Sequence, residues 1–268
     1  MSGYFENKVA VVTGAASGLG LGITEHLLAN RAKAVFMGDV KEENLTRESE
    51  RLNKKYPGKV IPQLTDVTKL DQVEKVIHAA KAFDGHLDFV FNNAGMGMTY
   101  PTEKITYEIW KFIMDLNFWG AVYGTYTAIP IMREQGSGHI VNAGSVTGLI
   151  PVPYQAVYAA SKSAVISMTE CLQYELETEG LNFSVYCPGN VRTPIFGDMA
   201  PPPDSISVDE AVDFIFQELE KKTLVIIFPQ KMRDFAALYR LNRPEFDKMA
   251  RSIAAERREN YRTKGTYY

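Results

Sequence analysis

The stretch VAVVTGAASGLGLGITEHLLAN, residues 9–30, decides the fold of this chain. It opens with an apolar run at 9–13, typical of a buried strand, and closes with a stretch of helical length at 19–30. The glycines between them permit a tight turn, and the N-terminus of the following helix offers free N–H groups to a pyrophosphate. A glycine-rich turn also occurs as a plain tight turn, but its place between strand and helix favours a nucleotide site.

The same alternation continues along the chain. It predicts an α/β fold with a single Rossmann-type, doubly wound parallel sheet of about seven strands and helices on both faces. We interpret residues 1–268 as one domain. Strands are expected at 9–13, 34–37, 60–64, 87–91, 139–143, 183–187 and 224–228, and helices at 19–30, 42–55, 71–83, 107–134, 156–179 and 208–221.

Two segments depart from the alternation. Residues 193–207 contain three consecutive prolines and follow a strand end, so they form either a substrate lid or a rigid surface connection. Residues 230–268 have a helical pattern and carry ten Lys or Arg against five acids. This basic tail either contacts a membrane surface or a partner chain, or is simply a solvated helix face.

Composition excludes several function classes. The net charge of −3 gives no basic footprint for nucleic acid, and no apolar run reaches the ~18 residues of a membrane span. A short polar N-terminus without a signal-peptide pattern predicts a cytoplasmic protein. Cys171 and Cys187 are expected to be buried free thiols, and the four scattered histidines do not predict a metal site.

The cofactor is predicted from Asp39, which lies nineteen residues after Gly20 at the end of the second expected strand. A carboxylate at this spacing binds ribose hydroxyls and repels the 2′-phosphate of NADP, and Lys41 is the one nearby cation, so NAD is favoured. The alternative is that Asp39 only caps the next helix. Asp66-Val67 and the NNAG run at 92–95 follow two further strands, where the cofactor crevice should lie, although these residue types also favour turns.

Tyr158 and Lys162 are four residues apart and so share one face of a helix. An ammonium beside a phenol favours the phenolate and lowers the pKa of the phenol from its ordinary value near 10. Such a phenol can exchange a proton near neutral pH. The pair is common by chance, but Ser145 thirteen residues upstream and the glycine-rich turn make an active site the better interpretation.

At these residues the chain resembles the short-chain dehydrogenase/reductase family, in its ordinary, roughly 250-residue branch. The resemblance extends from about residue 8 to residue 229. The motifs that carry it are TGAASGLG at 13–20, Asp66, NNAG at 92–95, Asn117, Ser145, Tyr158-x-x-x-Lys162 and PGNVRT at 188–193. One departure is Gly144, where the family often has another serine.

The resemblance implies a role for each matching residue. Tyr158 would be the general acid/base, Lys162 would bind the nicotinamide ribose, and Ser145 would hydrogen-bond the substrate oxygen. Asn117 would hold, through its backbone, a water in the proton relay. The implied cofactor-binding residues are Gly14, Ser17, Gly18, Leu19, Gly20, Asp39, Asp66, Val67, Asn93, Ala94, Gly95, Tyr158, Lys162, Pro188, Gly189, Val191 and Thr193, with Ser145, Gln155 and Tyr158 on the substrate.

A mostly apolar set of residues is predicted around the substrate: Met96, Gly97, Met98, Val146, Val152, Tyr154, Gln155, Ile195, Phe196 and Met199. Such a pocket suits a lipophilic ketone or secondary alcohol, steroid-like or fatty. The expected activity is therefore NAD-dependent interconversion of a secondary alcohol and a ketone; the alternative is a non-catalytic NAD-binding regulator. The resemblance also implies a homodimer or homotetramer through the helices at 107–134 and 156–179.

Overall fold

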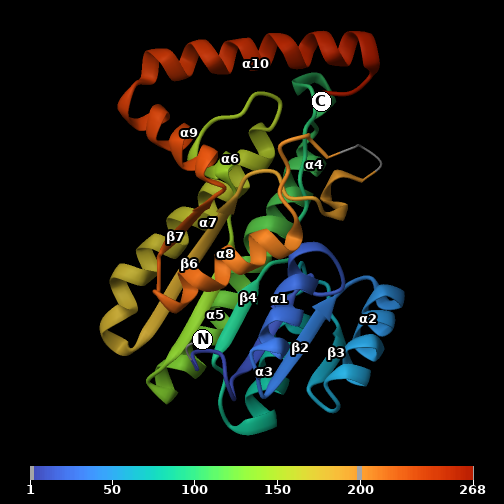
Figure 1. Ribbon diagram of the computed structural model, residues 1–268, viewed down its shortest axis with the longest axis vertical. Helices are drawn as coiled ribbons and strands as arrows, with labels where there is room; N and C mark the ends of the chain where they lie inside the picture. The colour runs from blue at the N-terminus through green and yellow to red at the C-terminus, as the bar shows by residue number, and fades with distance from the viewer. Residues whose placement is uncertain (1–2, 198–200, 268) are drawn as a thin grey trace.

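The computed structural model describes residues 3–197 and 201–267. Seven parallel strands form one sheet in the order β3-β2-β1-β4-β5-β6-β7 (Figure 1), which confirms the predicted doubly wound fold. The strand order reverses between β1 and β4, the switch point at which open α/β sheets bind ligands. The strands are β1 (Val9–Thr13), β2 (Ala34–Asp39), β3 (Val60–Leu64), β4 (Phe89–Asn92), β5 (Gly138–Ala143), β6 (Leu181–Pro188) and β7 (Val225–Phe228).

Helices cover both faces of the sheet, as predicted. The α-helices are α1 (Gly18–Ala29), α2 (Glu42–Lys55), α3 (Leu70–Asp84), α4 (Tyr107–Met114), α5 (Gly120–Gln135), α6 (Val146–Leu149), α7 (Ala156–Leu176), α8 (Val208–Glu220), α9 (Gln230–Leu241) and α10 (Arg243–Lys264).

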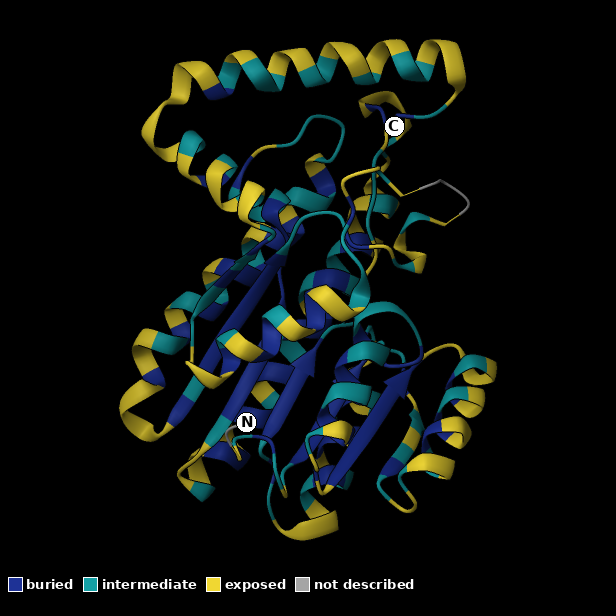
Figure 2. Cartoon of the chain, in the orientation of Figure 1, coloured by how far each residue is buried: buried dark blue, intermediate teal, exposed yellow. Residues whose placement is uncertain are grey.

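Alternate residues of the central strands belong to opposite cores. In β1, Ala10 and Val12 pack in the cluster with α1, α2 and α8, while Val9 and Val11 pack in the cluster with α3, α5 and α7. All five residues of β1 are buried, and the strands visible in the middle of the sheet are coloured mainly as buried in Figure 2. Because successive side chains of a strand point to opposite faces, a sheet covered on both faces favours apolar residues on both. The continuous apolar runs in the sequence reflect this double burial.

The single helix predicted over 107–134 is wrong in one respect. A π-helical turn, Asp115–Trp119, separates α4 from α5. The turn contains Asn117, whose side chain pairs with the backbone of Met96: Nδ2 donates to the Met96 carbonyl and Oδ1 accepts from the Met96 N–H, both at 3.0 Å. A π-turn adds one residue to the helix and is frequent at functional sites.

The basic tail is helical as predicted and forms two helices. α9 follows β7, and α10 runs across the end of the molecule where α6 and α4 lie (Figure 1). Cys187 is a buried free thiol as predicted, but Cys171 is exposed, because its position on α7 faces solvent. Within the described residues, no helix is long and apolar enough to cross a membrane.

Candidate active site

A cavity of about 340 Å³ opens beyond the carboxyl ends of β5 and β6. It is lined by Ser145, which follows β5, by Pro188 and Gly189 at the end of β6, and by Tyr158 from α7. The carboxyl edge of a doubly wound sheet is the expected place for a ligand.

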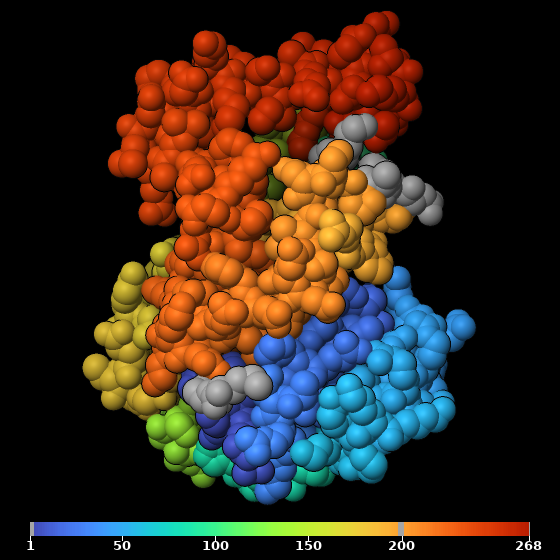
Figure 3. Space-filling model, in the orientation of Figure 1, coloured from blue at the N-terminus to red at the C-terminus, as the bar shows by residue number. Residues whose placement is uncertain are grey.

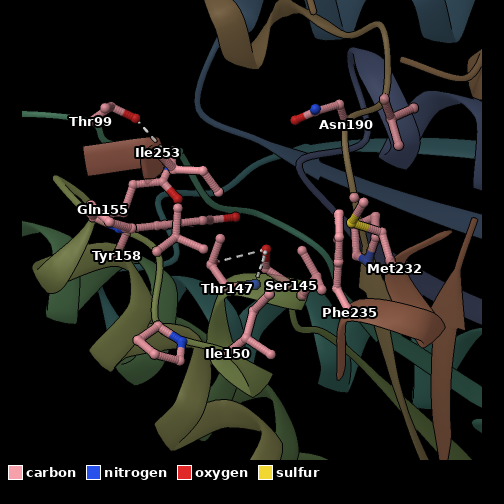
Figure 4. Close-up of a pocket in the computed structure, with 18 of the residues that line it drawn as sticks. Thr99, Ser145, Thr147, Ile150, Gln155, Tyr158, Asn190, Met232, Phe235 and Ile253 are labelled. Atoms are coloured by element: carbon pink, nitrogen blue, oxygen red, sulfur yellow. Dashed lines mark hydrogen bonds between the residues drawn. The ribbon is translucent and has the colours of Figure 1, made fainter. Parts of the chain in front are cut away.

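Ser145 is held at the N-cap of the short helix α6. Its Oγ accepts from the backbone N–H of Thr147 at 3.3 Å and from the Thr147 hydroxyl at 3.0 Å. Ser145 is only 5% exposed, and its Oγ faces the cavity with the hydroxyl of Thr147 beside it (Figure 4). Sequence reasoning missed Thr147. The signal that could have identified it is its position two residues after a serine that caps a helix.

Tyr158 lies in the first turn of α7 and reaches into the same cavity. Its ring extends from the helix with the hydroxyl directed toward Ser145 (Figure 4). Gln155 precedes the helix, lines the cavity and donates from Nε2 to the Thr99 hydroxyl at 2.8 Å. The three residues predicted to contact substrate, Ser145, Gln155 and Tyr158, are therefore brought together.

Lys162 lies one helical turn below Tyr158 and is buried, with 4% of its surface exposed. Its Nζ donates to the carbonyl of Ala143 at 2.7 Å and lies 5.9 Å from the centroid of the Tyr158 ring. Burial disfavours the ammonium and lowers the pKa of Lys162 from 10.5 to about 8. A lysine held at this cost beside a phenol suits electrostatic control of a proton donor better than a packing role.

Asn117 and the NNAG motif form one unit with this lysine. A Cβ on Gly95 would lie 2.9 Å from Asn117 Oδ1 and 3.4 Å from Lys162 Nζ, so only glycine lets the loop approach this closely. Since the Asn117 amide is engaged by Met96, the side chain positions the loop. The backbone of the π-turn is then the part of Asn117 that could bind a water. Binding a water through the backbone is the role that the resemblance implies for this residue.

The glycine-rich loop has the geometry that a pyrophosphate needs. Gly14 and Gly18 have φ of +64° and +52°, a region that favours glycine, and α1 begins at Gly18. Within the described part of the chain, the side chain of the N-cap residue Ser17 does not cap α1, which leaves the first N–H groups of the helix for an anion. The loop residues therefore fit a dinucleotide.

The loop is braced by the end of β4. Thr13 Oγ1 accepts from the N–H groups of Asn93 and Ala94, each at 3.0 Å, and Asn93 Nδ2 donates to the Thr13 carbonyl at 2.8 Å. The hydroxyl of Tyr186 donates to Asn93 Oδ1 at 2.7 Å. The Asn93 side chain thus holds two cofactor loops together.

Asp39 ends β2 and is 8% exposed. One carboxylate oxygen accepts from the N–H of Ala16 in the glycine-rich loop, and the other accepts from the N–H of Lys41, both at 2.9 Å. The second contact resembles the local capping alternative, while the first places the negative charge beside the nucleotide loop. Both observations fit a carboxylate that is fixed in position before a ribose arrives.

Asp66 and Val67 lie farther out, at the end of β3. Asp66 Oδ1 accepts from both the N–H and the hydroxyl of Thr68, so its side chain shapes a turn. Val67 is buried and lies where a Cβ on Gly120 would contact it at 3.0 Å. Neither residue lines the cavity that holds Tyr158.

Most of the predicted pocket residues line the cavity, and so do several of the predicted cofactor-binding residues. These are Gly97, Met98, Val146, Val152, Gln155, Ile195 and Phe196, with Leu19, Pro188, Gly189, Val191 and Thr193.

Two residues of the predicted pocket set do not line this cavity. The backbone of Met96 pairs with the Asn117 side chain, and the ring of Tyr154 packs against Tyr267. Met199 lies outside the described residues. The residues that sequence reasoning missed are mostly apolar and come from α6 and the residue after it, from the segment after β6, and from α9 and α10: Thr147, Ile150, Asn190, Met232, Phe235, Phe246, Met249, Ile253 and Arg257.

Gly144, the departure from the family pattern, has a packing reason. A Cβ at this position would lie 2.8 Å from both Cys187 Sγ and Val185 Cγ2. The two β6 side chains occupy the space that a serine would need, while Ser145 keeps its place at the N-cap.

Comparisons with known proteins identify the family to which this chain is similar. The family model described as short chain dehydrogenase matches residues 8–203. The 3-oxoacyl-(acyl-carrier-protein) reductase of Thermotoga maritima is 36% identical over 193 residues, 71% of this chain and 76% of that protein.

Two solved structures share the fold at similar levels. A short-chain dehydrogenase/reductase from Burkholderia phymatum, in complex with NAD, has a TM-score of 0.80 and 28% identity, covering 88% of this chain and 93% of that one. A short-chain dehydrogenase from Burkholderia cenocepacia, in complex with NADP, has a TM-score of 0.80 and 27% identity, covering 92% and 98%. The family match ends before α9 and α10 begin.

Proposed function

This chain belongs to the short-chain dehydrogenase family, and we propose that, as an oxidoreductase of that family, it interconverts a secondary alcohol and a ketone with NAD as cofactor. The observation that carries the proposal is the cavity into which Tyr158 and Ser145 both open, with Lys162 buried behind them. This set contains a proton donor, a polarising hydroxyl and a fixed cation, the parts that carbonyl reduction needs.

Each residue then has one role. Bound NADH would supply the hydride. Tyr158 gives its proton to the carbonyl oxygen during reduction and takes it back during oxidation. Because Ser145 Oγ accepts a hydrogen bond from Thr147, its own proton is directed away from Thr147 and toward a substrate oxygen. Lys162 stabilises the phenolate that Tyr158 becomes.

NAD is proposed over NADP because of Asp39. Its carboxylate is fixed by Ala16 and Lys41 beside the glycine-rich loop, where a 2′-phosphate would meet a like charge. Related structures contain either nucleotide, so the preference rests on this residue rather than on the family. Kinetics with NADH and NADPH test the assignment.

A lipophilic substrate is proposed because the cavity wall is mainly apolar. Ile150 and Val152 come from the segment between α6 and α7, and Ile195 and Phe196 extend the wall from the segment after β6. Thr193, Ile195 and Phe196 support a lid in 193–207, although that segment includes residues outside the described part. A steroid-like or fatty ketone would bury this surface.

We also propose a homodimer or homotetramer in the cytoplasm. Aromatic side chains are exposed on α4, the π-turn, α5 and α7, and a second copy would cover them through a two-fold interface. The exposed fractions are 52% for Phe112, 44% for Trp119, 57% for Tyr126 and 69% for Tyr174. The free thiols Cys171 and Cys187 suit a reducing compartment.

Turnover of NADH with a panel of apolar ketones tests the function, with Tyr158→Phe as the matched variant. The Phe side chain removes only the hydroxyl, so NADH should bind as before while turnover falls by about two orders of magnitude or more. Near-normal turnover by the variant would reject Tyr158 as the acid/base. Nucleotide binding without turnover of any ketone would instead favour the non-catalytic regulator.

A further inference from the structure

The helix α10 covers the cavity with a single apolar stripe. Phe246, Met249, Ala250 and Ile253 recur at helical spacing and line the cavity, whereas Arg251 and Ser252 between them are exposed. Met249, Ala250 and Ile253 are only partly buried. The space-filling view shows a hollow beneath α10 (Figure 3). A large part of this apolar stripe therefore faces the cavity.

The helix is fixed at its first turns. Phe246 is 1% exposed and packs edge-on against Tyr239 of α9, with the ring centroids 4.8 Å apart. Asn242 caps the helix by accepting from the N–H of Glu245. Because Phe246 is inserted among the cavity residues, the first turns of α10 belong to the apolar core next to the site.

The far end of α10 is attached to the loop that leads into α7. Arg257 Nη1 donates to the carbonyl of Pro153 at 2.6 Å. Tyr267 is 6% exposed; its ring stacks on Tyr261, with centroids 4.7 Å apart, and packs on Tyr154, with centroids 5.0 Å apart. Since Pro153 and Tyr154 immediately precede Gln155, these contacts join the end of α10 to the loop that carries Gln155.

The position of Ile253 defines one wall of the space that a substrate would occupy. Ile253 lies beside Gln155 and Tyr158, whereas Met232 and Phe235 of α9 lie on the other side of Ser145 (Figure 4). A substrate with its carbonyl oxygen at Tyr158 would extend its apolar body between these two walls.

We propose that α10 is the element that limits substrate size, with Ile253 and Met249 as specificity-determining residues. This proposal rests on the proposed ketone reductase activity and adds the length of the substrate to it. The occupant of the hollow is the apolar chain of the ketone, because the hollow is continuous with the surface around the Tyr158 hydroxyl. The matched family model ends at residue 203, so this wall lies outside the part of the chain that the model covers.

The test compares methyl ketones of increasing length, from butanone to undecanone, on the full-length protein. Ile253→Trp fills the hollow and should lower kcat/KM for undecanone at least about tenfold more than for butanone. Ile253→Ala should shift the preference toward longer ketones. Ser252→Trp places the same side chain on the exposed face of α10 and should leave the length profile unchanged.

The Kd for NADH should be equal in all four proteins, which separates a local wall from general damage to the fold. A length profile that is the same in Ile253→Trp and in the wild type would overturn the proposal. If the wild type reduces none of the ketones, the proposed function is rejected. Binding of the dye ANS, an aromatic sulfonate that fluoresces on apolar surfaces, to the NADH-loaded proteins then tests the wall instead. A loss of dye affinity in Ile253→Trp but not in Ser252→Trp supports the wall, and equal affinities reject it.

Discussion

Replacing Lys162 with methionine should stabilise the folded protein while it removes catalysis. Lys162 is 4% exposed, and burial lowers the pKa of its ammonium from 10.5 to about 8. The pKa of Lys162 is lower in the folded protein than in the unfolded chain. Between these two pKa values the unfolded chain binds more protons, so the free energy of unfolding rises with pH. Below about pH 8 the folded state therefore carries the full cost of the buried charge.

The gap between the two pKa values corresponds to about 3 kcal/mol. Methionine is apolar, fills similar space and carries no charge to desolvate. Its one loss is the hydrogen bond from Lys162 Nζ to the Ala143 carbonyl, worth about 1 kcal/mol. The variant should thus gain about 2 kcal/mol at neutral pH, and the gain should disappear as the pH rises above the unfolded value.

Urea unfolding followed by tryptophan fluorescence measures this difference at neutral pH and near pH 10. Lys75→Met is the matched control, because Lys75 is exposed on α3 and its replacement should change the unfolding free energy little. Activity should fall in Lys162→Met because the Tyr158 phenolate loses its cation. A variant less stable than the wild type at neutral pH, or a gain that is equal at both pH values, would refute the reasoning.

Four further outcomes follow from the site and the core. Asp39→Asn keeps the bond from Ala16 but removes the charge, so kcat/KM with NADPH relative to NADH should rise about 100-fold or more, as expected for a like-charge contact of ~3 kcal/mol; an unchanged ratio would reject the NAD assignment. Burial lowers the pKa of His139 from 6.5 to about 3, so the unfolded chain binds more protons than the folded protein as the pH falls through this range. The free energy of unfolding should drop by about 1.4 kcal/mol per pH unit because of this group. In urea titrations, His139→Asn should flatten the dependence of this free energy on pH. Gly144→Ser should cost about 1–3 kcal/mol of unfolding free energy through overpacking against Cys187, and a neutral effect in thermal denaturation would show that β6 yields easily. Phe112→Glu should convert the oligomer to smaller species in light scattering, and a wild-type protein that is monomeric at micromolar concentration would contradict the proposed interface.

The sheet could be predicted because its strands are buried on both faces. Runs such as 9–13 and 183–187 are mainly apolar on both faces, and a run of this kind indicates a strand of a parallel sheet when helices alternate with it. That Ser145, Gln155 and Tyr158 line one cavity could be anticipated because their residue types recur at short spacing. The four-residue separation of Tyr158 and Lys162 places both on one helix face whatever the details of packing.

Other features of the structure have no recognisable pattern in the amino-acid sequence. The π-turn at Asp115–Trp119 adds one residue, and the apolar residues on either side still fit a helix, so a continuous helix was the natural prediction. Asn117 and Met96 are twenty-one positions apart, and their pairing depends on tertiary structure. The stripe on α10 was hidden because exposed Arg and Lys between its members gave the tail the appearance of a solvated helix.

Placing a substrate wall on α10 separates the evolution of selectivity from the evolution of chemistry. The residues that we propose to hold the nucleotide and move the proton lie on the sheet edge and α7, where changes would also disturb the core. Met249 and Ile253 are only partly buried and lie outside the two large cores that flank the sheet, so their replacement should cost less folding free energy than changes at the sheet edge. A lineage that carries this tail can therefore explore new substrates by substitutions at a few positions, while the catalytic apparatus stays under unchanged selection.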